Sequence, residues 1–130
     1  MVKRICVLFV ITAAFFAGCK SDDSSVTPTN TNHAPNAPSE PTPRDAATNV
    51  SSPVTLSWQC TDPDAGDELS YDVYEGTTNP PSMAVATDLK HSTYSLGPIS
   101  PNTVIYWKVK AKDNNGATTE GPVWWFKTGN

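Results

Sequence analysis

The stretch Thr103–Ala111, with the sequence TVIYWKVKA, decides the fold. Apolar and polar side chains alternate along it, which is the pattern of a strand that buries one face of a sheet. The buried face is expected to carry Ile105, Trp107, Val109 and Ala111. The opposite face then carries Tyr106, Lys108 and Lys110, so one segment supplies both core and surface.

The same period of two recurs, with varying strength, in five further segments. These segments are residues 54–59, 69–74, 83–89, 92–96 and 123–128. Asp113–Gly116 predicts a hairpin turn, because an Asn-Gly pair tolerates the positive φ angles that such turns require. None of these segments has the i, i+3, i+4 apolar spacing of a helix. Six or seven short strands separated by turn residues therefore predict an all-β sandwich.

Residues 1–18 are predicted to be an export signal. Lys3 and Arg4 precede an apolar run, Ile5–Ala17, that is shorter than the roughly 20 residues a membrane-spanning helix needs. The Phe-Ala-Gly that precedes Cys19 resembles the cleavage site of bacterial lipoproteins. This resemblance implies that Cys19 carries lipid, with acyl chains such as palmitate anchoring the chain in a membrane. The alternative is an ordinary secretory signal in which Cys19 is incidental.

A disordered tether is predicted for residues 19–36, followed by one domain over residues 37–130. The tether is rich in Ser, Thr, Asn, Asp and Pro, and it has too few apolar residues to fold. Its start, Lys20–Asp23, resembles acidic signals that send some Gram-negative lipoproteins to the cell surface. The expected location is therefore the cell envelope, as an outer-membrane lipoprotein that is periplasmic or surface-exposed.

Charge and cysteine content exclude two properties. The formal net charge is −4, and it becomes about −6 once the signal is removed, which argues against a nucleic-acid partner. Cys6 leaves with the signal and Cys19 is expected to carry lipid. Cys60 is then the single free thiol, so no internal disulfide is expected, and we interpret Cys60 as a packing residue.

Several motifs together resemble fibronectin type III modules of bacterial extracellular proteins. They include Leu56–Trp58, the turn Asp62–Asp67, the strand Leu69–Tyr74 and the segment Gly121–Trp124. The resemblance covers about residues 38–128. It implies an immunoglobulin-like β-sandwich of the fibronectin type III type, with about seven antiparallel strands. It also implies that the third, sixth and seventh strands are neighbours in one sheet.

No catalytic constellation is expected, so the protein is interpreted as a non-enzyme. His33 and His91 belong to no nucleophile–base spacing, and the sequence has no phosphate-binding loop or Cys/His metal motif. No cofactor is therefore expected, apart from calcium in one acidic loop. That loop contains Asp62, Asp64, Asp67 and Glu68, and carboxylate oxygens are the ligands calcium prefers. The alternative is a plain turn, since Asp and Gly also favour turns.

A second candidate site is the outward face shared by three predicted strands. Its hypothetical binding residues are Tyr74, Tyr106, Lys108 and Trp125. The face has three interpretations: lysine stems that cover the rings without any ligand, a contact with a surface protein, or stacking on a glycan. The resulting hypothesis is non-catalytic protein or cell-surface binding and adhesion. The alternatives are a carbohydrate-binding accessory module, or a structural spacer from a truncated larger protein.

Overall fold

The computed structural model describes residues 31–130. All secondary-structure elements in this part of the chain are strands. The predicted signal, Cys19 and residues 19–30 of the predicted tether lie outside the described residues. Within residues 31–130 there is no helix long and apolar enough to cross a membrane.

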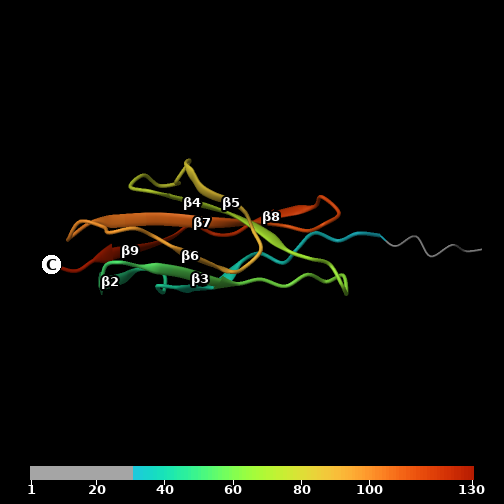
Figure 1. Cartoon of the computed structure of the whole chain (residues 1–130), viewed down its shortest axis with the longest axis horizontal. Coiled ribbons are helices and arrows are strands. Elements are labelled where there is room, and N and C mark those ends of the chain that lie inside the picture. Colours follow the sequence, from blue (N-terminus) through green and yellow to red (C-terminus); the bar gives the residue numbers. More distant parts are fainter. Residues whose placement is uncertain (1–30) are drawn as a thin grey trace, which may run out of the picture.

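Nine strands form two stacked sheets in the described part of the chain (Figure 1). The first sheet has the order β1–β3–β6, and the second has the order β2–β9–β7–β4–β5, with β8 paired to β7. The strands are β1 (Ser39–Thr42), β2 (Ala47–Val50), β3 (Thr55–Gln59), β4 (Ser70–Gly76), β5 (Ala84–Leu89), β6 (Thr93–Ser95), β7 (Val104–Lys112), β8 (Thr118–Glu120) and β9 (Trp124–Thr128). The predicted all-β sandwich is confirmed, as is the adjacency of β4, β7 and β9.

The domain has more strands than the predicted seven, because the chain forms two short strands at its beginning, β1 and β2, and two at its end, β8 and β9. At the beginning, the chain passes from the first sheet to the second between β1 and β2, and Ala46 N–H donates to the Trp125 carbonyl at this crossing. At the end, Gly121 interrupts β8 and β9, and its N–H donates to the Val109 carbonyl. A Cβ on Gly121 would lie 3.1 Å from that carbonyl oxygen, so any other residue here would force its neighbours to shift by a few tenths of an ångström. In addition, β2 runs parallel to β9, which the antiparallel prediction did not include.

The core consists of the inward-facing residues of both sheets. All four residues predicted to face inward on β7 are buried, and Trp107 is fully buried at the centre. Trp107 packs against Trp124 at 4.7 Å between ring centroids, and Trp58 meets Tyr71 edge-on at 5.3 Å. Truncating a buried Trp to Ala costs about 3–5 kcal/mol in typical domains, so this cluster dominates stability.

The folded part of the chain begins before residue 37. Residues Asn32–Asn36, which the sequence places in the tether, lie against the domain and are called the strap below. Pro35 is buried, and its carbonyl accepts a hydrogen bond from the Thr119 hydroxyl at 2.6 Å. The Cys60 thiol, half-buried at the end of β3, donates to the Asn36 carbonyl. Cys60 thus has the packing role predicted for it.

Candidate functional site

The outward face of β4, β7 and β9 forms one continuous surface. Tyr106 lies opposite Trp125 across β7 and β9, and Lys108 lies opposite Tyr74 across β7 and β4. Residues on β7 alternate strictly between buried and half-buried. This register brings the four predicted binding residues together on one face.

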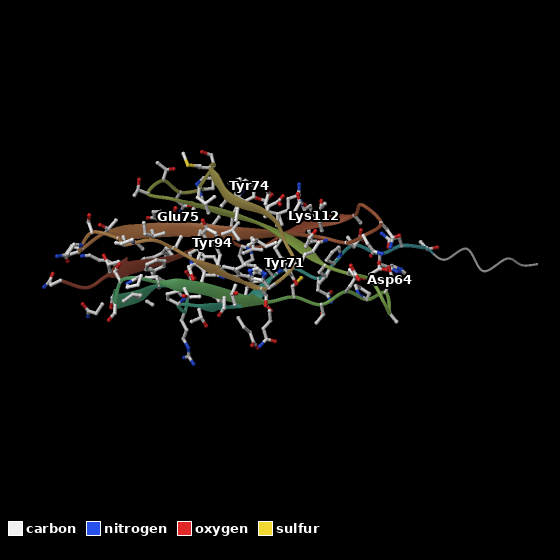
Figure 2. All side chains as sticks on the ribbon, in the orientation of Figure 1. Asp64, Tyr71, Tyr74, Glu75, Tyr94 and Lys112 are labelled. Carbon is white, nitrogen blue, oxygen red and sulfur yellow. The ribbon has the colours of Figure 1, made fainter. Side chains whose placement is uncertain are left out.

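One half of this face is held together by its own charges and is called the paired patch. Lys108 places its Nζ 5.1 Å from the centroid of the Tyr74 ring and forms an ion pair with Glu120. The other members of the paired patch are Lys112, Asp72 and Asp88. The Lys112 Nζ lies 2.8 Å from Asp72 Oδ1 and 2.6 Å from Asp88 Oδ1. Tyr74 and Lys112 are labelled in Figure 2.

These contacts shift the acid–base equilibria of the paired patch. Hydrogen bonding to Lys112, reinforced by its charge, lowers the pKa of the Asp88 carboxyl. The hydrogen bonds to Asp72 and Asp88 raise the pKa of Lys112. Hydrogen bonding to Lys108 lowers the pKa of Glu120. The position of Lys108 over the Tyr74 ring is the lysine-over-ring arrangement, one of the three interpretations of this face.

The other half of the face, called the open patch, consists of Tyr106, Trp125 and Lys127. Within residues 31–130, the Tyr106 hydroxyl, the Trp125 indole N–H and the Lys127 ammonium have no hydrogen bond or ion pair. Trp125 is half-buried, whereas the other three tryptophans of the sequence are buried. The four predicted residues do not include Lys127, although it follows Trp125 by two positions and so shares its face.

The acidic loop lies at the end of the domain where the strap meets it, as the position of Asp64 shows in Figure 2. One carboxylate oxygen from each of Asp62, Asp64 and Asp67 lies within 4.8 Å of the others. Glu68 is not in this group. It is exposed, and its backbone N–H donates to Asn114 Oδ1. The loop therefore brings three of its four predicted ligands together.

The strap is joined to this loop by hydrogen bonds, both directly and through Asn115. The backbone N–H of His33 donates to Asp64 Oδ2, and His33 Nδ1 lies 2.9 Å from Asp64 Oδ1. Asn115, in the β7–β8 turn, donates from its side-chain amide to both Asn32 Oδ1 and Asp67 Oδ2. The hydrogen bonds from His33 lower the pKa of Asp64, and the same contact raises the pKa of His33.

Four of the six carboxylate oxygens of the three aspartates accept protein hydrogen bonds. They are Asp62 Oδ1, both oxygens of Asp64, and Asp67 Oδ2. Asp62 Oδ2 is buried and has no partner. Calcium usually takes six to eight oxygens, so an ion here would need further ligands beyond these three side chains. The arrangement is that of a turn that holds the strap, and calcium remains a prediction.

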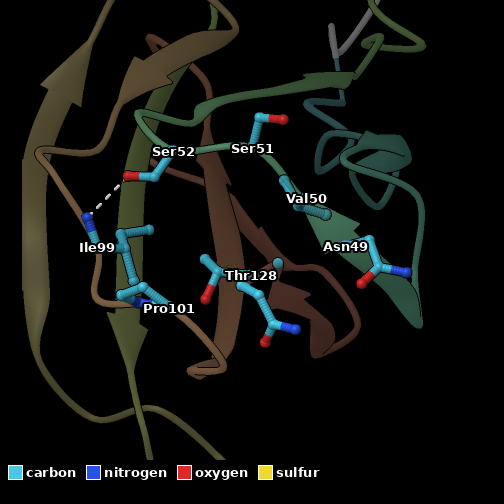
Figure 3. A pocket seen from close by; sticks show the side chains of 9 residues that line it. Asn49, Val50, Ser51, Ser52, Ile99, Pro101 and Thr128 are labelled. Atoms are coloured by element: carbon cyan, nitrogen blue, oxygen red, sulfur yellow. Dashed lines mark hydrogen bonds between the residues drawn. The ribbon is translucent and has the colours of Figure 1, made fainter.

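Two hollows lie away from every predicted site residue. The first, of about 500 Å³, is lined by neutral side chains, and in it Ser52 Oγ accepts a hydrogen bond from Ile99 N–H (Figure 3). The second, of about 600 Å³, is lined by Trp58 and Trp124 together with Glu40, Arg44 and Asp45. Neither hollow is lined by a residue of the open patch.

Comparison with solved structures identifies the fold. An Fn3-like protein from Clostridium thermocellum matches with a TM-score of 0.54 and 25% identity, over 75% of this chain and 97% of that chain. The fibronectin type III domain of the human fibronectin type III domain containing protein 3 matches with a TM-score of 0.51 and 18% identity. That match covers 78% of this chain and 92% of the human domain.

A larger protein contains a similar unit. An α-L-rhamnosidase from Dictyoglumus thermophilum matches with a TM-score of 0.56 and 18% identity. The match covers 75% of this chain but only 12% of the rhamnosidase, so it concerns a single domain of that enzyme. No family model and no curated protein matches the chain.

Proposed function

Since the described part of the chain is a fibronectin type III-like domain, we propose that it is a non-catalytic binding module that the cell displays on its envelope. The groups that could act as nucleophile or base support this role. His33 is bonded to Asp64 at the strap, Cys60 donates to a backbone carbonyl, and His91 is exposed beyond the end of β5. Within residues 31–130, the two histidines and the thiol form no hydrogen bond with one another.

The proposal includes a lipid anchor at Cys19, joined to the domain by a tether. The apolar run and the small residues before Cys19 support it. Cells expressing the full chain are fractionated, with Cys19→Ala as the variant and Ser21→Ala as its control. Wild type and Ser21→Ala are expected in the outer-membrane fraction, and Cys19→Ala in the soluble envelope fraction. Retention of Cys19→Ala in the membrane would contradict the anchor.

The observation that carries the binding function is the open patch. Two aromatic rings and one ammonium group lie side by side on one sheet, and their polar atoms have no partner within residues 31–130. In the paired patch, by contrast, lysine and tyrosine contact each other. Surface aromatic residues with unpaired polar groups are enriched where proteins bind partners. The open patch is therefore the proposed contact surface.

The test compares adhesion of cells that display the full chain at matched surface levels. Tyr106→Ala and Trp125→Ala are expected to reduce adhesion at least about tenfold, the size of one lost aromatic anchor. The matched control is Met83→Ala, because Met83 is 69% exposed and lies outside the face. Equal adhesion of all three variants and wild type would remove the binding role and leave a structural spacer.

A second candidate is a carbohydrate-binding accessory module. The cross-strand pair Tyr106–Trp125 favours it, because sugar rings stack on aromatic side chains. A glycan array that gives a signal dependent on Trp125 would select this class. A signal unchanged by Trp125→Ala would reject it.

A further inference from the structure

Charge is distributed unevenly over the domain. Residues 31–130 contain eleven acidic and six basic residues, because Lys3, Arg4, Lys20, Asp22 and Asp23 precede them. Five of the six basic residues are lysines, and four of these lie on the outward face of β7 and β9. They are Lys108, Lys110, Lys112 and Lys127. An acidic domain thus presents one basic face.

Most of this positive charge is balanced within the protein. Lys108 pairs with Glu120, and Lys112 pairs with Asp72 and Asp88. Lys110 lies in register between Glu120 and Asp72, on the strands to either side. Lys127 differs, because its cross-strand neighbour is Val104. Within residues 31–130 neither Lys110 nor Lys127 forms an ion pair, and of these two lysines only Lys127 lacks an acid in register beside it.

Lys127 stands beside the two open rings. Trp125 and Lys127 are two positions apart on β9, which places them about 7 Å apart on the same face. Tyr106 is directly opposite Trp125, and its neighbour on the other side is Gly76, which has no side chain to cover the ring. Asp45, between β1 and β2, uses Oδ1 to accept the Trp125 backbone N–H. The open patch thus combines two half-buried rings with one ammonium group that forms no ion pair within residues 31–130.

We infer that the open patch binds an acidic polysaccharide, one whose sugar rings carry carboxylate groups. This inference rests on the proposed binding function and names its ligand class. A sugar ring stacks on Tyr106 and Trp125, and a carboxylate of the chain pairs with Lys127. A neutral glycan would leave the Lys127 charge without a role.

The experiment measures binding of the full chain, in detergent, to two polymers with the same sugar backbone. They are polygalacturonate and its fully methyl-esterified form, which differ only in the negative charge. Acrylamide quenching of tryptophan fluorescence reports binding, because Trp125 is half-buried whereas the other three tryptophans are buried. We expect polygalacturonate to bind at least about tenfold more tightly than the ester, and the difference to shrink as salt is added.

Variants separate the two parts of the recognition. Lys127→Gln is expected to reduce the preference for the charged polymer about tenfold while leaving ester binding unchanged. Lys90→Gln, which removes the same charge away from this face, is the control and should behave as wild type. Trp125→Ala should weaken binding of both polymers, and Trp125→Phe should restore part of it. Thermal unfolding confirms that each variant is folded.

Two outcomes would overturn the inference. The first is equal affinity for both polymers, and the second is a preference that persists in Lys127→Gln. If neither polymer binds while adhesion still requires Trp125, the acidic-polysaccharide inference is wrong and the binding function stands. A protein captured by cross-linking at the open patch would then be the partner. If adhesion does not require Trp125 either, the proposed function itself fails.

Discussion

The acidic loop and the open patch differ in how many of their polar groups the protein itself uses. In the loop, four of the six aspartate oxygens accept hydrogen bonds. The donors are His33 of the strap, the backbone of the loop itself and Asn115. In the open patch, the polar groups of Tyr106, Trp125 and Lys127 have no partner within the described residues. Both regions stand out in composition. The contacts of the loop indicate a role in folding, and the unpaired groups of the patch support the proposal that it binds a partner.

The same contrast exists within the sheet face itself. The paired and open patches share strand β7, and both contain aromatic and lysine side chains. In the paired patch, Lys108 and Lys112 form ion pairs with acidic side chains that are not their direct register partners. In the open patch, Lys127 is opposite Val104 and forms no ion pair within residues 31–130. Residue type alone therefore does not separate the two patches, whereas their ion pairs do.

The largest expected effect is the difference in stability between substituting an inward residue of β7 and substituting its outward neighbour. Trp107→Ala should lower the free energy of unfolding by about 3–5 kcal/mol, because Trp107 is fully buried. Tyr106→Ala, its outward neighbour, should cost less than about 1 kcal/mol. Urea denaturation followed by circular dichroism measures both. A large loss in Tyr106→Ala would mean that the open patch serves stability.

The next effect tests whether the acidic loop serves folding. Asn115→Ala removes two hydrogen bonds that join the strap and the loop, so a loss of about 1–2 kcal/mol is expected. Asn114→Ala is the control, since Asn114 accepts one hydrogen bond, from the exposed Glu68. Differential scanning calorimetry compares the two. Adhesion should stay at the wild-type level in both, and loss of adhesion in Asn115→Ala would place binding at the loop.

A smaller effect tests the paired patch through pH. The pKa of Asp88 is lowered by Lys112, so this contact stabilises the fold above the ordinary carboxyl pKa of about 3.9. The stabilisation is lost as pH falls through the lower, folded-state value. Lys112→Met should therefore show a shallower fall in melting temperature than wild type between about pH 5 and pH 2. Parallel curves would show that the contact does not contribute.

The smallest effect concerns calcium at the acidic loop. Protein hydrogen bonds already occupy four of the six oxygens, so millimolar calcium should raise the melting temperature by less than Asn115→Ala lowers it. Magnesium at equal ionic strength is the control, and Asp62→Asn tests whether the unpaired Asp62 Oδ2 takes part. A large, calcium-specific rise in melting temperature that is lost in Asp62→Asn would show that the loop binds calcium.

The sequence predicts the sandwich well because alternation records burial directly. Every predicted run corresponds to a strand, and the inward residues of β7 are buried as expected. Strands β1, β2 and β8 escaped the pattern because they are three or four residues long and largely exposed. The strap escaped it because polar composition predicts disorder, whereas its contacts come from residues 24 to 84 positions away.

The candidate site was predicted only in part. Alternation places Tyr74, Tyr106, Lys108 and Trp125 on one face, and the structure agrees. Alternation gives no information on which lysine forms an ion pair with an acidic side chain. Glu120 and Asp88 come from strands whose register depends on the whole sheet. The division into paired and open patches is therefore a tertiary property.

Photo-cross-linking on intact cells tests the central claim most directly. A photoreactive phenylalanine derivative is introduced in place of Tyr106 in the full chain, and in place of Met83 as the control. The account predicts adducts of higher mass from position 106 that are absent from position 83. Identical adducts from both positions, or none from position 106 in cells that still adhere, would contradict a binding role for the open patch.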